Sequence, residues 1–286
     1  MIPLTIIIPA YNEEKGIRAT LEDVMSFCGP EGAGHQIILV DDASGDKTSA
    51  IAGEFDRVTI LKNPVNIGYG GSIKRALLRA THEHVLIMDA DGTYPAAEIT
   101  KLVPHAEEFD MVVGKREGRY YHGSPVKRLS RLIFYVLLKY VTGESIPDAN
   151  SGLRVFRKSI VTKFMGDLCS GFSFTTTITI MMLSNQYLIK FVPIEYKKRI
   201  GKSKVRFFRD SLRTLQLLVE AIAFYNPIKA FLPFSVVSFA AAAYFTAQYF
   251  FTGLTPYMIC ASIFSFSALL FFSFGVLGYI MTRSKK

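Results

Sequence analysis

The stretch His84-Val85-Leu86-Ile87-Met88-Asp89-Ala90-Asp91 decides the fold, because its apolar run ends in two carboxylates separated by one residue. Such a run predicts a buried central strand, and open α/β sheets bind ligands at the carboxyl ends of their strands. Side chains at i and i+2 of an extended backbone point the same way, so Asp89 and Asp91 can face one cation. Mg²⁺ and Mn²⁺ prefer such oxygen ligands. The pair predicts a metal site completed by a diphosphate, although aspartates are also common in turns.

Other apolar runs also end in polar clusters. They predict further strands at residues 4–8, 36–40, 58–61, 111–113 and 188–194. Helical patterns lie between the runs: one ends near Phe27, one extends from about Ser72 to Thr81, and one starts near Pro95. Strands that are apolar throughout and alternate with helices predict a mainly parallel sheet covered on both faces. We therefore expect an α/β domain, Rossmann-like in its alternation, in which the polar clusters share one ligand site.

The glycine-rich stretch at residues 68–72 (GYGGS) follows an Asn/Pro loop after the third predicted strand. It is not a GxGxxG motif and does not open a first βα turn, which argues against a nicotinamide dehydrogenase. Its glycines either form a tight turn that brings a helix close to the sheet or contact a phosphate directly. The sequence leaves both interpretations open.

The C-terminal part of the chain is apolar enough to cross a membrane. Of the 286 residues, the 53 from Ala230 to Thr282 include no Asp, Glu, Lys, Arg or His. Two transmembrane helices are predicted, 228–251 and 257–281, each long enough for a hydrocarbon core of roughly 30 Å. The lack of ionisable groups argues against a buried hairpin of a soluble protein, and it predicts an anchor and not a channel.

Positive charges predict the orientation of these spans. Lys229 precedes the pair, Arg283, Lys285 and Lys286 follow it, and the loop at 252–256 is uncharged. The positive-inside rule then places both ends and the preceding domain in the cytoplasm. The net charge of +9 suits a phosphate-rich partner, and the cysteines, Cys28, Cys169 and Cys260, form no CxxC pair, as expected in a reducing compartment.

Two basic segments precede the spans. Residues 197–206 include six Lys or Arg residues, and an amphipathic helix is predicted to follow at 205–227. The helix predicted at 125–141 begins with basic residues, among them Arg128 and Arg131, and continues as a strongly apolar segment. It is either a core helix or a helix at a membrane surface. Basic clusters beside a membrane attract anionic headgroups, and such a loop can also close over phosphates.

Five motifs occur in a recognisable order: PAYNEE at 9–14, VDDAS at 40–44, DADG at 89–92, GKR at 114–116 and DANSGLR at 148–154. In order and spacing, roughly over residues 3–206, they resemble the GT-A fold, family 2 glycosyltransferases. The resemblance is closest to the dolichyl-phosphate mannose synthase-like branch, whose members transfer a sugar from a nucleotide donor to a polyprenyl phosphate. It implies a GT-A domain and an inverting, metal-dependent transferase.

The resemblance also implies roles for individual residues. The donor nucleotide would be held by Pro9, Tyr11, Glu13, Val40, Asp42, Asp89, Ala90 and Asp91. The metal, Mg²⁺ or Mn²⁺, would bind to Asp89 and Asp91, and Asp89, Asp91 and Arg116 would be the catalytic residues. The need for cationic groups around an anionic acceptor, apart from the resemblance, gives the candidates to bind the acceptor phosphate: Arg116, Arg128, Arg131, Arg199 and Lys204.

The chain departs from that branch at three places. Thr93 stands where a Gln or another polar ligand often follows the second metal aspartate, so the choice of metal stays open. The stretch at 171–177 lacks the Gln and Glu of mannose synthases, so the sugar is not assigned. The segment at 199–204 is one residue shorter than the mannose-synthase loop, so Lys204 is assigned less securely than Arg199. Asp148 is either catalytic or, as its place before a turn favours, a structural cap.

We expect three parts: a GT-A domain at residues 1–204, an amphipathic juxtamembrane segment at 205–227, and two transmembrane helices with a basic tail at 228–286. The expected activity moves a hexose from a UDP- or GDP-sugar to undecaprenyl or dolichyl phosphate on the cytoplasmic face of the cell membrane. The expected partners are the nucleotide sugar, the lipid phosphate and the membrane, and no nucleic acid. The amphipathic segment can also mediate assembly of a homo-oligomer, whose subunit number the sequence leaves open.

Two other functions stay open. A processive polysaccharide synthase shares the front half of the pattern, but its QxxRW segment needs a Trp, and the chain has none. Its polymer would also need a channel of more spans. A catalytically silent membrane scaffold that binds a nucleotide or a partner subunit is the second alternative, and the presence of both Asp89 and Asp91 argues against it.

Overall fold

The structure is a computed structural model that describes residues 2–29, 34–118, 125–171, 173–200, 216 and 226–283. The chain divides into two compact units, Met1–Ser211 and Leu212–Lys286, each of which is described by itself. Lys204 and most of the predicted amphipathic segment at 205–227 lie outside the described residues. The predictions made for them therefore stay predictions.

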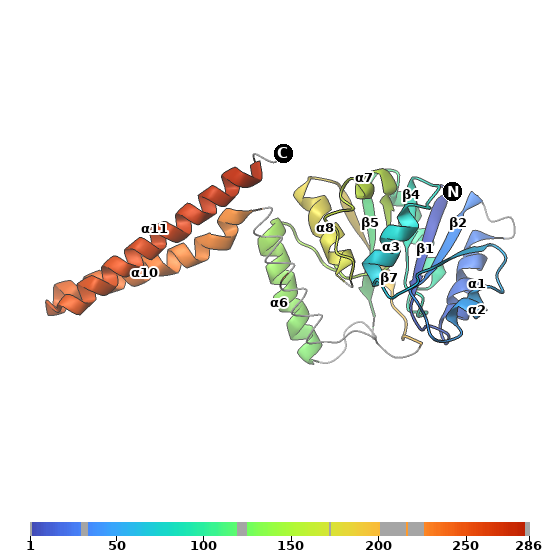
Figure 1. The fold of residues 1–286 in the computed structure, drawn as a ribbon, viewed down its shortest axis with the longest axis horizontal. Coiled ribbons are helices and arrows are strands. Elements are labelled where there is room, and N and C mark those ends of the chain that lie inside the picture. The colour runs from blue at the N-terminus through green and yellow to red at the C-terminus, as the bar shows by residue number, and fades with distance from the viewer. Residues whose placement is uncertain are drawn as a thin grey trace. The chain divides into compact units, whose positions relative to one another are not determined.

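The first unit is built on a seven-stranded sheet with the order β3-β2-β1-β4-β6-β5-β7 (Figure 1). Its strands are β1 (Leu4–Ala10), β2 (Gln36–Asp41), β3 (Val58–Lys62), β4 (His84–Ile87), β5 (Met111–Glu117), β6 (Arg154–Arg157) and β7 (Ile189–Glu195). Strand β6 is antiparallel to both of its neighbours, and all the other pairs are parallel. The predicted mainly parallel sheet is confirmed, with β4 at its centre.

The helices of this unit include those predicted between the strands, and further ones at 48–52, 158–163 and 174–184 that were not predicted. They are α1 (Ile17–Cys28), α2 (Thr48–Ala52), α3 (Tyr69–Leu77), α6 (Pro125–Thr142), α7 (Lys158–Lys163) and α8 (Phe174–Ser184). The helix predicted from Pro95 is broken into η2 (Ala96–Glu98), α4 (Ile99–Leu102) and η3 (Val103–His105). Pro104 lies in the last of these pieces, and a proline offers no N–H to continue an α-helix.

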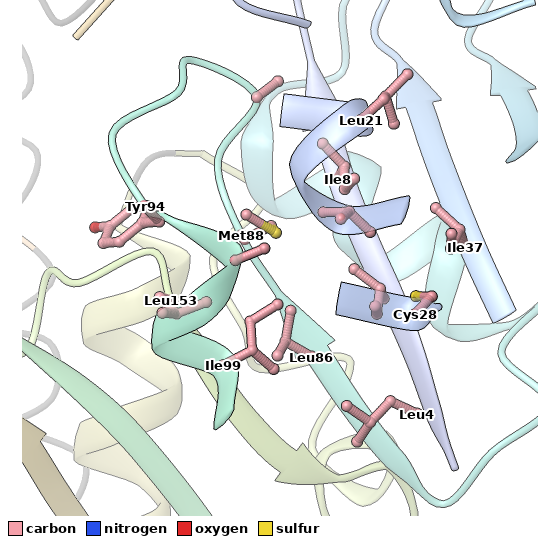
Figure 2. Close-up of a cluster of buried hydrophobic side chains, with 14 of the residues drawn as sticks. Leu4, Ile8, Leu21, Cys28, Ile37, Leu86, Met88, Tyr94, Ile99 and Leu153 are labelled. Carbon is pink, nitrogen blue, oxygen red and sulfur yellow. The ribbon is translucent and has the colours of Figure 1, made fainter. Parts of the chain in front are cut away.

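Alternation along β1 divides the hydrophobic core into two layers. Leu4, Ile6 and Ile8 pack with Leu21 of α1 and with the short helix α4 (Figure 2). Ile7, between them, is fully buried on the opposite face, as the period of two requires. Each such side chain contributes roughly 1.5–3 kcal/mol through its burial. The polar residues that follow the central strands therefore start from well-buried strand ends.

The second unit consists of two long helices that lie side by side, α10 (Pro227–Thr252) and α11 (Thr255–Arg283) (Figure 1). Both are long and apolar enough to cross a membrane, and little of their surface is buried within the unit. Gly253, in the left-handed conformation at φ 67°, ends α10. The two helices match the predicted spans at 228–251 and 257–281 within a few residues.

Candidate active site

Polar residues gather where the parallel strands β1, β2 and β4 end. The backbone N–H of Asn12 donates to Ser44 Oγ (2.9 Å), that of Gly45 to Asn12 Oδ1 (2.7 Å), and that of Glu13 to Thr48 Oγ1 (2.8 Å). These bonds join the segments that follow β1 and β2. The segments predicted to hold the nucleoside therefore form one connected surface.

The predicted nucleoside residues occupy different depths on this surface. Tyr11 is 39% exposed, so its ring can meet a ligand. Pro9 is buried, and the side chain of Val40 is fully buried in the sheet. Any contact between Val40 and a ligand must therefore come from its main chain.

Asp42, directly after β2, is buried and organises the loop that leads into α3. Its Oδ1 accepts hydrogen bonds from Asn63 Nδ2 (2.8 Å) and Ile67 N (2.9 Å), and its Oδ2 accepts one from Gly68 N (2.9 Å). Backbone N–H bonds to a carboxylate are among the stronger hydrogen bonds in proteins. The Asp42 carboxylate thus fixes the 63–68 loop, and its predicted contact with a nucleoside stays a prediction.

The glycines at the start of α3 serve close packing. Gly70 N donates to Gly171 O (3.3 Å), and Gly71 N donates to Ser170 O (2.8 Å). A side chain at Gly70 would overlap the carbonyl of Cys169. Because these two N–H groups already meet protein carbonyls, the structure favours the tight-turn interpretation over direct phosphate contact.

Asp91 is buried and has partners on both carboxylate oxygens. Its Oδ1 accepts bonds from the N–H (3.1 Å) and the hydroxyl (2.5 Å) of Thr93, and its Oδ2 pairs with Arg199 Nη2 at 2.6 Å. Asp89 lies against Gly152, where a Cβ would come within 2.5 Å of its carboxylate. Only a glycine there leaves room for the Asp89 side chain.

The surroundings of Asp89 change its affinity for protons. Burial raises the pKa of Asp89 to about 6, and the adjacent charge of Asp91 adds to this rise. Arg199 opposes the rise, as does the hydroxyl of Tyr69, which lies beside Asp89. A shifted pKa of this kind, caused by burial and a neighbouring charge, is common at functional sites.

Arg116, on β5, forms a buried ion pair with Asp148. Its Nε and Nη2 donate to the two Asp148 oxygens at 2.8 Å each, and its backbone N–H adds a third bond at 3.1 Å. The guanidinium also lies over the ring of Tyr196, 5.4 Å from its centre. Asp148 is therefore the partner of Arg116, an arrangement that differs from the turn cap favoured by the sequence.

Arg154 is fully buried and fixes the loop between Asp148 and β6. It donates to Ala149 O (3.0 Å), Ser151 O (2.5 Å), Thr175 O (2.9 Å) and Thr179 Oγ1 (3.0 Å). Burial lowers its pKa to about 10. The sequence placed Arg154 in a motif but gave it no role, and the structure shows it holding the loop that carries Asp148 and Gly152.

The other predicted phosphate ligands lie on two segments. On α6, Arg128 is exposed and Arg131 is half-buried. Arg199 follows β7 and reaches Asp91, as described above. Lys204 lies outside the described residues, so its role remains a prediction, as do those of Arg128 and Arg131.

The carboxylate oxygens of Asp89 and Asp91 are suitable ligands for a hard divalent cation. Asp91 already pairs with a positive charge, the guanidinium of Arg199. Among the described residues, no group of three or more His, Cys, Asp or Glu side chains could hold a metal unaided. Mg²⁺ is commonly bound by one or two carboxylates together with substrate phosphates and water. The pair therefore fits a metal that binds with a diphosphate.

Comparison with known families and structures identifies the family and the fold of the chain. A family model described as Glycosyl transferase family 2 matches residues 5–164, more than half of the chain. The fold is similar to that of glucosyl-3-phosphoglycerate synthase from Mycobacterium tuberculosis, crystallised with Mn²⁺, UDP and glucosyl-3-phosphoglycerate, with a TM-score of 0.64, 18% identity and 77% and 80% of the two chains covered. This likeness confirms the predicted GT-A fold.

Curated relatives extend the match. An undecaprenyl-phosphate 4-deoxy-4-formamido-L-arabinose transferase of Pectobacterium carotovorum is 26% identical over 98% of this chain and 88% of its own. A dolichyl-phosphate beta-glucosyltransferase of Trichomonas vaginalis is 25% identical over 77% and 71%. An uncharacterized protein of Methanocaldococcus jannaschii is 31% identical over 71% and 87%.

Proposed function

We propose that this chain, which belongs to glycosyl transferase family 2, transfers a sugar from a nucleotide diphosphate donor to a polyprenyl phosphate in a membrane. One observation carries the proposal: a carboxylate pair suited to a metal–diphosphate site occurs in one chain with two helices long enough to span a membrane. A relative that acts on undecaprenyl phosphate matches nearly the whole chain, including those helices. The donor would be a UDP- or GDP-hexose, and the acceptor undecaprenyl or dolichyl phosphate.

The residues after β1, β2 and β4 would bind the donor. Tyr11 would contact the nucleoside together with Pro9, Glu13, Val40 and Asp42. Asp89 and Asp91 would hold Mg²⁺ or Mn²⁺ with the donor diphosphate, and that cation would supply charge stabilisation for the departing nucleoside diphosphate. Gly152 leaves room for the Asp89 carboxylate, and the positive charge of Arg116, which is paired with Asp148, acts on that carboxylate.

The acceptor needs little activation. A phosphate monoester has a second pKa near 6, so at neutral pH it is mostly a dianion that can attack the anomeric carbon without a general base. The task of the protein is to bring two anions together, which requires cationic side chains at fixed positions. Arg116, Arg128, Arg131, Arg199 and Lys204 would supply them. Attack opposite the leaving group inverts the anomeric centre.

The membrane arrangement is part of the proposal. The two helices of the second unit would cross the membrane with Lys229 and Arg283 on the cytoplasmic side, and the enzyme domain would then lie there too. Nucleotide sugars and a lipid-linked phosphate would then meet on one face of the cell membrane.

The test is a donor and acceptor panel. Membranes that hold the full-length protein are incubated with labelled UDP- and GDP-sugars and with undecaprenyl or dolichyl phosphate, and label in the solvent-extracted lipid is counted. We expect one donor to label the lipid only when the lipid phosphate is added. Nucleotide binding without transfer to any polyprenyl phosphate would contradict the proposal and favour the silent scaffold, and label in a polymer would favour a polysaccharide synthase.

A further inference from the structure

The segment at residues 197–200, called the strap below, contributes the positively charged side chain of Arg199 to the predicted metal site. Arg199 Nη2 lies 2.6 Å from Asp91 Oδ2, and the Asp91 side chain is 2% exposed whereas that of Arg199 is 30% exposed. Arg199 therefore occupies one side of a nearly buried carboxylate from the solvent direction. Its partner is one of the two aspartates that would bind the metal.

Main-chain hydrogen bonds hold the strap in this position. Lys197 N donates to Thr93 O (2.9 Å), and Ile200 N donates to Asp91 O (3.0 Å). The side chain of Ile200 packs on Gly92, where a Cβ would lie 2.8 Å from it. Arg199 lies between Lys197 and Ile200, which are both hydrogen-bonded to the loop after β4. These two hydrogen bonds therefore hold Arg199 beside Asp91.

The contact between Arg199 and Asp91 reduces the repulsion between two neighbouring carboxylates. Two aspartates side by side in a partly buried position repel each other, and the effective dielectric constant there is lower than in water. Arg199 offsets that repulsion when no metal is present. A divalent cation on the same oxygen would in turn repel Arg199 at contact distance.

We propose that Arg199 is an internal counter-ion of Asp91, which a divalent cation must displace when it binds together with the donor diphosphate. This inference rests on the proposed function, because it takes Asp89 and Asp91 as metal ligands. The displaced guanidinium is then free to bind phosphate, where its planar fork can form two bonds. The metal therefore binds weakly to the protein alone and far more tightly when a nucleoside diphosphate is present.

The experiment measures Mn²⁺ binding without catalysis. Full-length protein in detergent is titrated with Mn²⁺, and the electron paramagnetic resonance signal of free Mn²⁺ gives the affinity, first without nucleotide and then with saturating UDP or GDP. Mn²⁺ that binds to the protein alone must first displace the guanidinium from Asp91 Oδ2, and a tenfold loss of affinity corresponds to about 1.4 kcal/mol. We therefore expect Arg199→Gln to bind Mn²⁺ alone about tenfold more tightly than the natural protein, with a smaller further gain from nucleotide.

Two variants serve as controls. Lys198→Gln removes an equal charge from an exposed neighbour in the strap and should leave Mn²⁺ affinity unchanged. Arg199→Lys keeps the charge and should stay within about threefold of the natural protein. Equal affinity of Arg199→Gln and the natural protein, or an equal gain in Lys198→Gln, would overturn the inference and leave the proposed function intact. Absence of Mn²⁺ binding in every protein, with or without nucleotide, would overturn both.

Discussion

At the scale of single residues, Asp89 and Asp91 differ in the polar partners of their carboxylates. Both oxygens of Asp91 have partners, in Thr93 and Arg199. Asp89 lies in a position where burial and the charge of Asp91 raise its pKa to about 6. Functional sites often contain buried ionisable groups whose charge destabilises the folded protein until a ligand of opposite charge binds. The two aspartates therefore give different predictions.

Replacing Asp91 with Asn should remove the activity and spare the fold. The amide keeps an oxygen for the bonds from Thr93 but loses the charge that binds a cation. Metal stabilisation of a leaving group is worth several kcal/mol, so we expect sugar transfer to fall about a thousandfold or more. Transfer to the lipid fraction and the melting temperature of the purified protein are measured together.

Asp56→Asn is the matched control for this substitution, because Asp56 is exposed in the turn before β3, away from the carboxyl ends of the strands. It should transfer sugar at the normal rate. Full activity in Asp91→Asn would reject the metal role of Asp91.

Replacing Asp89 with Asn should stabilise the metal-free protein at neutral pH. Between pH 3.8, the ordinary value, and about 6, the folded state binds more protons at Asp89 than the unfolded state does, so stability falls as pH rises through this window. The advantage of Asn is thus full above about pH 6 and vanishes as pH falls toward 3.8. We expect roughly 1–3 kcal/mol at pH 7.5, measured as a higher melting temperature with chelator present. A lower melting temperature of Asp89→Asn at that pH would show that the ionised Asp89 side chain stabilises the metal-free protein, contrary to this prediction.

At the scale of elements, two ion pairs that involve β5 differ in burial and should therefore differ in their contribution to stability. Arg116 pairs with Asp148 with side chains 17% and 3% exposed, and this pair joins β5 to the loop that leads into β6. Lys115 pairs with Glu117 with side chains 39% and 50% exposed. Exposed pairs contribute about 0–1 kcal/mol, whereas removing one member of a buried pair costs about 3–5 kcal/mol.

Asp148→Asn should therefore destabilise the enzyme domain by about 3 kcal/mol, and Glu117→Gln by less than about 1 kcal/mol. For a domain of this size, the first change corresponds to a fall in melting temperature of roughly 6 °C or more. Thermal unfolding of the two purified variants is compared. Equal melting temperatures would show that the Arg116–Asp148 pair does not hold the loop.

The sequence predicted most of the sheet, because its parallel strands are continuous apolar runs that end in polar clusters. It missed β6, whose four residues begin and end with Arg and belong to the motif at 148–154. Its register depends on Arg154, a buried cation whose partners on α8 lie more than 20 residues away in sequence. The pairs Arg116–Asp148 and Arg199–Asp91 were also out of reach, because charge patterns alone do not indicate which distant side chains meet.

At the scale of the whole molecule, the chain combines an enzyme domain with two apolar helices long enough to cross a membrane. The predicted amphipathic segment would connect them. The apolar helices α10 and α11 carry no charge between Ala230 and Thr282, so their orientation must be set by the residues at their ends.

This arrangement predicts that the loop at 252–256 and the C-terminus lie on opposite sides of the membrane. In a background with the three native cysteines replaced by Ala, Leu254→Cys should react with a membrane-impermeant maleimide added to intact cells. Lys285→Cys should react only after the cells are opened. Labelling of the C-terminal cysteine in intact cells would contradict a cytoplasmic C-terminus.

Metal removal is the sharpest test of the proposed site, since Asp89 and Asp91 would hold a metal that stabilises the departing nucleoside diphosphate. Purified full-length protein is given the donor and polyprenyl phosphate that label the lipid in the panel, with excess EDTA, and then Mn²⁺ or Mg²⁺ is restored. We expect labelling of the lipid to stop with EDTA and to return with either metal. Undiminished transfer in EDTA, or transfer of the sugar without any lipid phosphate present, would contradict it.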